Sequence, residues 1–168
     1  MKAIDLIRDA LETTDEGIKR MVQGLEGDPL VSPTLGAKGG DGNHPLWLMG
    51  HLAYIEGSLR YILQGERNPV EDWAPLFATG TTPVADAATY PPFTEVMARY
   101  AELRAGTLRL VNSMGERGLD EAPKQIPPGF EDAFRTVGHT LLVVALHQMV
   151  HYGQMADARR AAGLKPLM

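Results

Sequence analysis

The sequence has no cysteine among its 168 residues. Disulfide bonds, catalysis by a protein thiolate and cysteine-bound zinc are therefore excluded. It also has no basic run, and its formal net charge is −5. Nucleic acid is not expected as a partner, because phosphate binding needs clustered Lys and Arg. No apolar run is long enough to span a bilayer, so no membrane association is expected.

The remaining composition is that of an ordinary globular protein, with 44% hydrophobic and 22% charged residues. Together with the chain length, it predicts a single domain over residues 1–168 that buries a real core. Acidic residues at Asp5 and Asp9 interrupt the apolar start of the chain. A secretory signal is therefore not expected. A cytoplasmic location is expected instead.

Apolar residues recur at spacings of three and four in four segments, which is typical of amphipathic helices. We predict helices over residues 4–25, 45–64, 95–114 and about 131–162. Gly27-Asp28-Pro29 is expected to end the first helix, and Asn43 or His44 is expected to cap the second. Thr94 is the expected N-cap of the third helix, and Gly163 follows the fourth.

Two connectors are long. Residues 33–42 are rich in glycine but lack the Gly-Lys-Ser/Thr pattern of a phosphate loop, so we interpret them as a flexible connector. Residues 66–92 form a second, longer connector in which Trp73, Leu76 and Phe77 could contact the bundle. A helix of ~20 residues is ~30 Å long, so a connection between two parallel helices must cross the whole bundle. The sequence therefore predicts an all-α four-helix bundle with a long crossover between helices two and three.

Three histidines fall at helical positions compatible with one metal ion. His147 and His151 are four residues apart and hence about 40° apart on one helix face. His51 occupies a similar flank of the second predicted helix. Any one of them could be a hydrogen-bonded core residue, but the three together favour a site for zinc, nickel or ferrous iron. Three protein ligands would leave coordination positions open, as in catalytic sites.

Other polar residues on these helices allow two interpretations each. His44 is expected at the helix start or the rim of a pocket, and Tyr54 in the core rather than in a pocket wall. Glu56 lies 140° from His51, so it could pair with Arg60 or with a neighbouring helix instead of binding metal. Gln154 lies about 20° from His147 on the same face and could contact a ligand histidine or substrate, or be exposed.

Further residues are expected to play structural roles. Trp47 and Tyr152 are expected to pack as ordinary aromatics, and His139 lies about 80° away from the face of His147. Arg159 and Arg160 could bind an anionic substrate, although a solvated helix end is the simpler interpretation.

Several known kinds of site do not match. A zincin needs His-Glu-x-x-His, whereas Gln148 stands at the position of the glutamate. Di-iron bundles need Glu-x-x-His, which does not occur in this chain. No nucleophile elbow is present, so nothing in the sequence points to a serine hydrolase.

Two stretches resemble motifs of the DinB-like (YfiT-like) metal-dependent family. The first is Trp47-Leu48-Met49-Gly50-His51-Leu52-Ala53-Tyr54-Ile55-Glu56. The second is His147-x-x-x-His151-x-Gly153-Gln154, followed by Arg159-Arg160 and Gly163-Leu164. The resemblance covers nearly the whole chain, including the crossover.

The resemblance implies an up-down-down-up four-helix bundle, often a homodimer. It implies that His51, His147 and His151 bind a divalent metal, commonly nickel or zinc. Relatives include transferases that use bacillithiol, mycothiol or glutathione, and maleylpyruvate isomerases that use a thiol cofactor. A metal would lower the pKa of such a thiol, which then attacks an electrophile. The lack of cysteine is compatible with this chemistry, because the sulfur comes from the small molecule.

Three functions stay open at this point. The first is a metal-dependent transferase or isomerase that uses a low-molecular-weight thiol and has an open cleft beside His51. The second is a metal-dependent hydrolase, for which neither Glu56 nor Gln148 offers a clear general base. The third is a non-catalytic, stress-related metal-binding protein, which could dimerise through an apolar helix face. The fourth helix is apolar nearly all round from Val137 to Val150, so it is either central in the core or partly in an interface.

Overall fold

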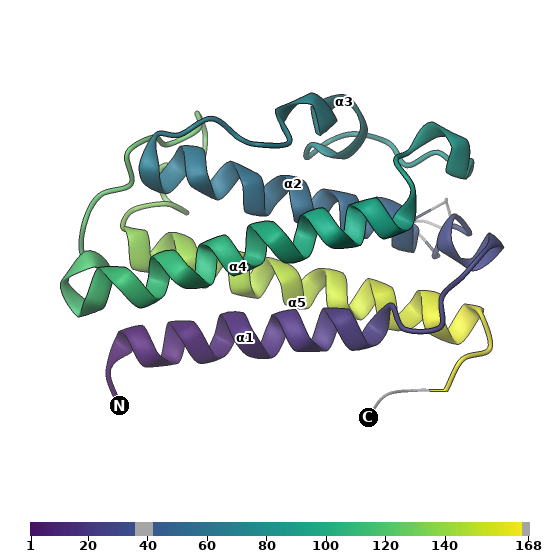
Figure 1. The fold of residues 1–168 in the computed structure, drawn as a ribbon, viewed down its shortest axis with the longest axis horizontal. Helices are drawn as coiled ribbons and strands as arrows, with labels where there is room; N and C mark the ends of the chain where they lie inside the picture. Colours follow the sequence, from purple (N-terminus) through teal and green to yellow (C-terminus); the bar gives the residue numbers. More distant parts are fainter. Residues whose placement is uncertain (36–41, 166–168) are drawn as a thin grey trace.

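The computed structural model describes residues 1–35 and 42–165, and its elements over those ranges are helices (Figure 1). The long helices are α1 (Ala3–Met21), α2 (Pro45–Gln64), α4 (Phe93–Gly118) and α5 (Val137–Ala161). Shorter ones are η1 (Asp28–Leu30), η3 (Glu71–Trp73), α3 (Ala74–Phe77) and η4 (Ala87–Thr89). The predicted all-α class is confirmed. Residues 36–41 of the predicted flexible connector lie outside the described ranges.

The long helices contact one another side by side. α1 packs against α4 and α5, and α2 packs against the same two helices. Figure 1 shows α1 and α5 running in one direction, and α2 and α4 in the other. Contacts at the helix ends agree with this arrangement: the carboxylate of Glu116 accepts a hydrogen bond from the backbone N–H of Ala3 (3.0 Å), and Arg159 donates to the carbonyl of Met21 (3.0 Å). No helix in the described ranges combines the length and hydropathy needed to cross a bilayer.

The bounds of α2 match the sequence prediction. His44 Nδ1 accepts a hydrogen bond from the backbone N–H of Trp47 (3.1 Å), and Pro45 follows as the first helical residue. Both features favour a helix start. At the other end Gly65 adopts a left-handed conformation (φ 75°), which stops the helix at low steric cost.

Three other predicted ends were wrong. α5 begins at Val137 rather than near Glu131, because Thr136 is extended and its hydroxyl accepts from the N–H of His139 (3.1 Å). Thr94 lies in the first turn of α4, which Pro92 precedes as N-cap. α1 ends at Met21, although Leu25 is still buried beyond it. At α1 and α5, local capping or turn geometry ends the helix where the apolar spacing alone would extend it, whereas α4 begins before its predicted first residue.

The crossover over residues 65–92 contains η3, α3 and η4, and it packs directly on α2. Trp73 and Phe77 are buried there, as the sequence suggested, and Leu76 is partly buried against the same cluster. Two glycines of α2, Gly50 and Gly57, make this contact close. A β-carbon at Gly50 would overlap the ring of Phe77, and one at Gly57 would overlap the side-chain oxygen of Asn68. Because these two glycines have no side chain, the crossover can approach α2 closely at both positions.

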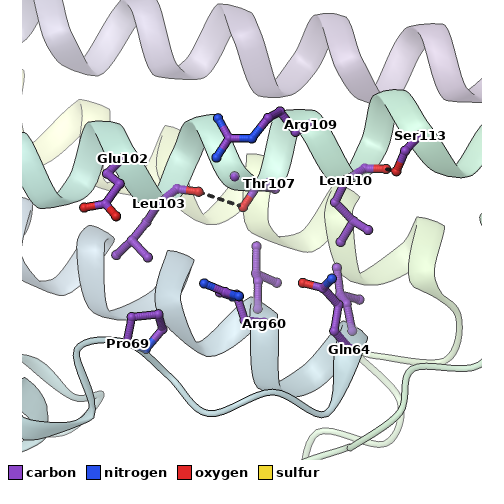
Figure 2. Close-up of a pocket in the computed structure, with 12 residues that line it drawn as sticks. Arg60, Gln64, Pro69, Glu102, Leu103, Thr107, Arg109, Leu110 and Ser113 are labelled. Atoms are coloured by element: carbon purple, nitrogen blue, oxygen red, sulfur yellow. Dashed lines mark hydrogen bonds between the residues drawn. The ribbon is translucent and has the colours of Figure 1, made fainter.

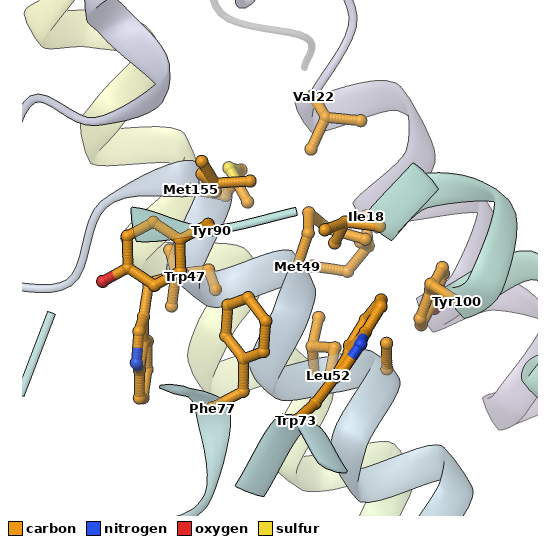
Figure 3. Close-up of a cluster of buried hydrophobic side chains, with 14 of the residues drawn as sticks. Ile18, Val22, Trp47, Met49, Leu52, Trp73, Phe77, Tyr90, Tyr100 and Met155 are labelled. Carbon is orange, nitrogen blue, oxygen red and sulfur yellow. The ribbon is translucent and has the colours of Figure 1, made fainter. Parts of the chain in front are cut away.

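The buried apolar residues form two clusters. One surrounds Trp47, Phe77 and Met155 at the end where α2 begins (Figure 3). The other surrounds Leu11, Val111 and Leu141 at the opposite end of the helices. Two groups of side chains thus pack separately along the length of the bundle.

Buried polar side chains from all four long helices lie between these clusters. Glu56 of α2 pairs with Arg104 of α4 (Oε1–Nη2, 2.8 Å), and its Oε2 accepts from the hydroxyl of Thr107 (2.8 Å). Gln148 of α5 donates to the hydroxyl of Tyr100 (2.7 Å), and its amide oxygen accepts from the Thr14 hydroxyl of α1 (2.6 Å). Each residue of this polar layer is buried. Hydrogen bonding across all four helices opposes sliding of one helix past another, since a slip would leave buried polar groups unpaired.

The close contact at Gly50 leads to a stability prediction. Gly50→Ala should lower the free energy of unfolding by roughly 1–3 kcal/mol, because the methyl group overpacks against Phe77. Gly153→Ala is the matched control, since nothing lies within 4 Å of a β-carbon at that helical position. The control should be neutral or more stable by up to about 1 kcal/mol. Urea unfolding measures both, and a Gly50→Ala variant as stable as the parent would contradict the packing argument.

Candidate metal centre

The structure brings together the three histidines selected from the sequence. His51 comes from α2, and His147 and His151 come from successive turns of α5. The Nε2 atom of His147 lies 3.3 Å from Nε2 of His51 and 3.0 Å from Nε2 of His151. His51 and His151 are buried, and His147 is half-buried. The three Nε2 atoms thus point at one small volume between α2 and α5.

Hydrogen bonds on the opposite ring nitrogens set the protonation of two of these rings. His51 Nδ1 lies 2.7 Å from the carbonyl oxygen of Phe77, and His151 Nδ1 lies 2.8 Å from Oε1 of Gln154. Both oxygens are acceptors, so each Nδ1 carries the hydrogen and each Nε2 presents a lone pair. Asn43 donates to the same Gln154 oxygen (3.3 Å), which fixes the orientation of that amide. These contacts are the kind that orient metal-binding histidines.

The ligand set fits a divalent transition metal. Two Nε2 lone pairs face His147, and a proton on His147 Nε2 can point fully at only one of them. A cation among the three nitrogens would satisfy all of them, with Zn–N distances of ~2.0–2.1 Å. The group that could hold an ion contains these three histidines and no carboxylate in the described residues. Imidazole-only sites suit zinc, nickel, copper or iron better than magnesium or calcium.

The indole of Trp47 supports the plane of His51. Their rings are stacked, with centroids 4.8 Å apart and an interplanar angle of 7°. Trp47 Nε1 donates to the carbonyl oxygen of Leu76 (3.0 Å), so the indole is held by the crossover. The sequence analysis treated Trp47 as an ordinary aromatic and missed this role. Its spacing of four before His51 on one helix is the signal that could have indicated it.

Burial keeps all three rings neutral near pH 7. Desolvation lowers the pKa of His51 to about 4, partly offset by the hydrogen bond to the Phe77 carbonyl, and repulsion from His151 in its protonated form lowers it further. Desolvation also lowers the pKa of His147 to about 4, with repulsion from His151 and His51 in the same direction. The pKa of His151 is lowered by burial as well, partly offset by its hydrogen bond to Gln154. Neutral imidazole is the form that binds metal.

Most of the other candidate residues lie outside the centre. His44 caps α2 and bonds to the carbonyl of Val84 (3.0 Å). Glu56 pairs with α4 rather than with Arg60, as one of its two interpretations anticipated. Tyr54 packs against the core cluster around Trp47. His139 bonds to the carbonyl of Ala133 (2.7 Å) at the far end of α5.

The two arginines that end α5 differ from each other. Arg159 is buried and donates to the carbonyl oxygens of Met21 and Gln23, so it fastens the end of α1 rather than facing solvent. Arg160 is exposed and pairs with Asp157. The interpretation of a solvated helix end was therefore wrong for Arg159 and fits Arg160.

The comparisons with known proteins agree with the fold and the motif. A family model described as the DinB superfamily matches residues 5–155, which include all three histidines and nearly all of the four long helices. No curated protein matches the chain.

The lowered pKa values predict a pH-dependent stability for the metal-free protein. In the unfolded chain these histidines titrate near pH 6.5, so between pH 6.5 and about 4 the unfolded state binds more protons than the folded state. The free energy of unfolding should therefore decrease as the pH is lowered through that window, by roughly 1 kcal/mol per pH unit for each of His51 and His147. Urea unfolding with a chelator at pH 7, 6 and 5 measures the slope. The double variant His51→Gln/His147→Gln should show a shallower slope, and an unchanged one would contradict the prediction.

Proposed function

We propose that this chain, which belongs to the DinB superfamily, binds one divalent transition metal ion through Nε2 of His51, His147 and His151. The convergence of three Nε2 atoms, two of them aimed by Nδ1 hydrogen bonds, is the observation that carries the proposal. Zinc and nickel are the expected metals, and ferrous iron is also compatible with three imidazoles. We also assign the bundle the up-down-down-up topology, with residues 65–92 as the crossover, which the helix directions in Figure 1 support.

We propose that the protein is a transferase or isomerase that uses a low-molecular-weight thiol such as bacillithiol, mycothiol or glutathione. The thiol would attack an electrophilic substrate. Three protein ligands would leave open a position for a sulfur atom, and the charge of a bound divalent ion would lower the pKa of that thiol toward neutrality. The chain contains no cysteine, so the sulfur nucleophile must come from the small molecule. His147 is the least buried of the three histidines and marks the side from which a small molecule would approach.

Metal-dependent hydrolysis is less well supported. It needs a general base beside the metal. Glu56 is already bonded to Arg104 and Thr107, and Gln148 is bonded to Thr14 and Tyr100. The residues that might have served as base or polar partner are thus engaged in the polar layer of the bundle.

A non-catalytic metal-binding protein is the second candidate. Three cavities in the described part of the chain are lined by residues other than the three histidines. A metal covered by protein, with no space for a substrate, would store or sense metal rather than catalyse. Binding of a thiol to the loaded site separates the two candidates.

The exposed side of α5 supports a homodimer. Leu142, Leu146, Met149 and Val150 are 42–62% exposed and recur at spacings of four, three and one along the helix. Apolar residues on one side of this helix thus pack in the core, and those on the other side face solvent. Contiguous apolar surface of this kind marks an interaction site, and we propose that a second copy of the chain covers it.

Metal analysis tests the ligand assignment. Purified protein should contain about one equivalent of zinc or nickel, and His51→Ala, His147→Ala and His151→Ala should each lose it after dialysis. Gln154→Ala should retain the site but weaken affinity roughly tenfold or more, because His151 loses its orienting partner. His139→Ala is the matched control on the same helix and should keep the metal. Metal persisting in both His147→Ala and His151→Ala would show that the ligand assignment is wrong.

Spectroscopy of cobalt-substituted protein tests the role of a thiol. Glutathione should add a saturable near-ultraviolet sulfur-to-cobalt band, whereas S-methylglutathione, whose sulfur has no ionisable proton, should not. The same titration with 2-mercaptoethanol shows whether the site prefers a particular thiol. Bound cobalt whose spectrum is unchanged by either thiol would contradict the transferase proposal and favour the non-catalytic candidate.

The dimer proposal predicts a mass near twice 18.3 kDa by light scattering. Leu146→Glu should shift the protein to the monomer, because a charge buried in an apolar interface is costly. Arg117→Glu, an exposed substitution on α4, is the control. A parent protein that is monomeric at micromolar concentration would contradict the proposal.

A further inference from the structure

The indole of Trp47 contacts one of the three proposed metal ligands face to face. It lies parallel to the imidazole of His51, with ring centroids 4.8 Å apart and an angle of 7° between the planes. Among the described residues, the ring contacts of His147 and His151 are edge-to-face ones with other histidines. A spacing of four residues places Trp47 and His51 on the same face of α2. The indole therefore acts on one ligand and not on the other two.

The crossover holds both stacked rings. Trp47 Nε1 donates to the carbonyl oxygen of Leu76 (3.0 Å) and to the hydroxyl oxygen of Thr81 (3.1 Å). The next carbonyl along the chain, that of Phe77, lies 2.7 Å from Nδ1 of His51. One short stretch of the crossover thus positions the indole and the imidazole together, and the stack is fixed by contacts outside α2.

The stacked rings are removed from water. Trp47 is 5% exposed and His51 is 3% exposed. Trp47 belongs to the buried cluster drawn in Figure 3. Three cavities in the described ranges, including the groove between α2 and α4 in Figure 2, are lined by residues other than these two. Attraction between a positive charge and an aromatic face is strongest where water is excluded.

A metal ion would change the charge of the ring that the indole faces. A neutral imidazole and an indole attract each other mainly by dispersion. An ion bound at Nε2 of His51 would give that imidazole a partial positive charge, and the negative face of an indole attracts such a ring. Only an interaction that differs between the free and the bound state changes an affinity. The stack should therefore be stronger with the ion than without it.

We propose that Trp47 is a positioning residue that tightens metal binding, because its indole face stabilises the positively charged, metal-bound imidazole of His51. The proposal rests on the three-histidine centre proposed above. A tryptophan that only filled the core would stabilise the bundle equally with and without metal. Trp73, the second of the two tryptophans, offers that comparison. It is buried in the same cluster, and its ring is inclined by 54° to that of Phe77.

Fluorinated tryptophan tests the proposal with little change in packing. Fluorine withdraws electrons from the face of the indole and weakens its attraction for a cation, while the shape of the ring is nearly kept. Trp73→Phe leaves Trp47 as the only tryptophan. This protein is made with ordinary, mono-, di- and trifluorinated tryptophan, and its zinc affinity is measured by competition with a chromogenic chelator. The zinc Kd should rise with each fluorine, to about tenfold for the trifluorinated protein.

The matched control carries the same fluorinated residues at the other position. Trp47→Phe leaves Trp73 as the only tryptophan, and its zinc Kd should not depend on fluorination. Urea unfolding of the chelator-treated proteins should give the same free energy of unfolding for every label at Trp47. A rise in Kd that is matched by a loss of this free energy would overturn the proposal.

Two further outcomes separate this proposal from that of the metal centre. Zinc that binds with a Kd independent of fluorination at Trp47, or with a Kd that rises equally when Trp73 carries the label, would overturn the role of the indole and leave the centre intact. A parent protein that binds no zinc would overturn both proposals.

Discussion

At Gly50 the ring of Phe77 lies against the backbone of α2, where any β-carbon would overlap it. This contact holds the crossover on the helix that carries His51, and it places the carbonyl of Phe77 2.7 Å from His51 Nδ1. The carbonyl fixes the hydrogen on Nδ1 and so turns the Nε2 lone pair toward α5. The same crossover holds Trp47, whose indole stacks on the His51 ring. One steric fit between a glycine and a phenylalanine therefore sets both the path of the crossover and the orientation of the first histidine.

The polar layer divides the bundle into two halves with different uses. A buried ion pair such as Glu56 and Arg104 adds little net stability, because desolvation offsets the attraction between the charges. Its effect here is on position: it joins α2 to α4 at one level, while Gln148 joins α5 to α1 and α4. The half that contains the start of α2 carries the histidines and is covered by the crossover. The other half is filled by the cluster around Leu11, Val111 and Leu141.

The metal centre is a cluster of side chains whose interactions are incomplete without a ligand. At the centre, the Nε2 atoms of His51 and His151 both face Nε2 of His147, and a single proton there cannot satisfy both. Arg159, by contrast, donates to the carbonyls at the end of α1.

The sequence by itself determined the helical class, the bounds of α2 and the selection of His51, His147 and His151, because these follow from local spacing and capping. Helical periodicity places His147 and His151 on one face whatever the tertiary structure is. Only the tertiary structure decided that the carbonyl of Phe77 orients the His51 ring and that Glu56 pairs with Arg104 instead of Arg60. It also decided which side of α5 faces solvent. These outcomes depend on contacts between residues far apart in the chain, and a pattern read along one helix carries no information about which neighbour it will meet.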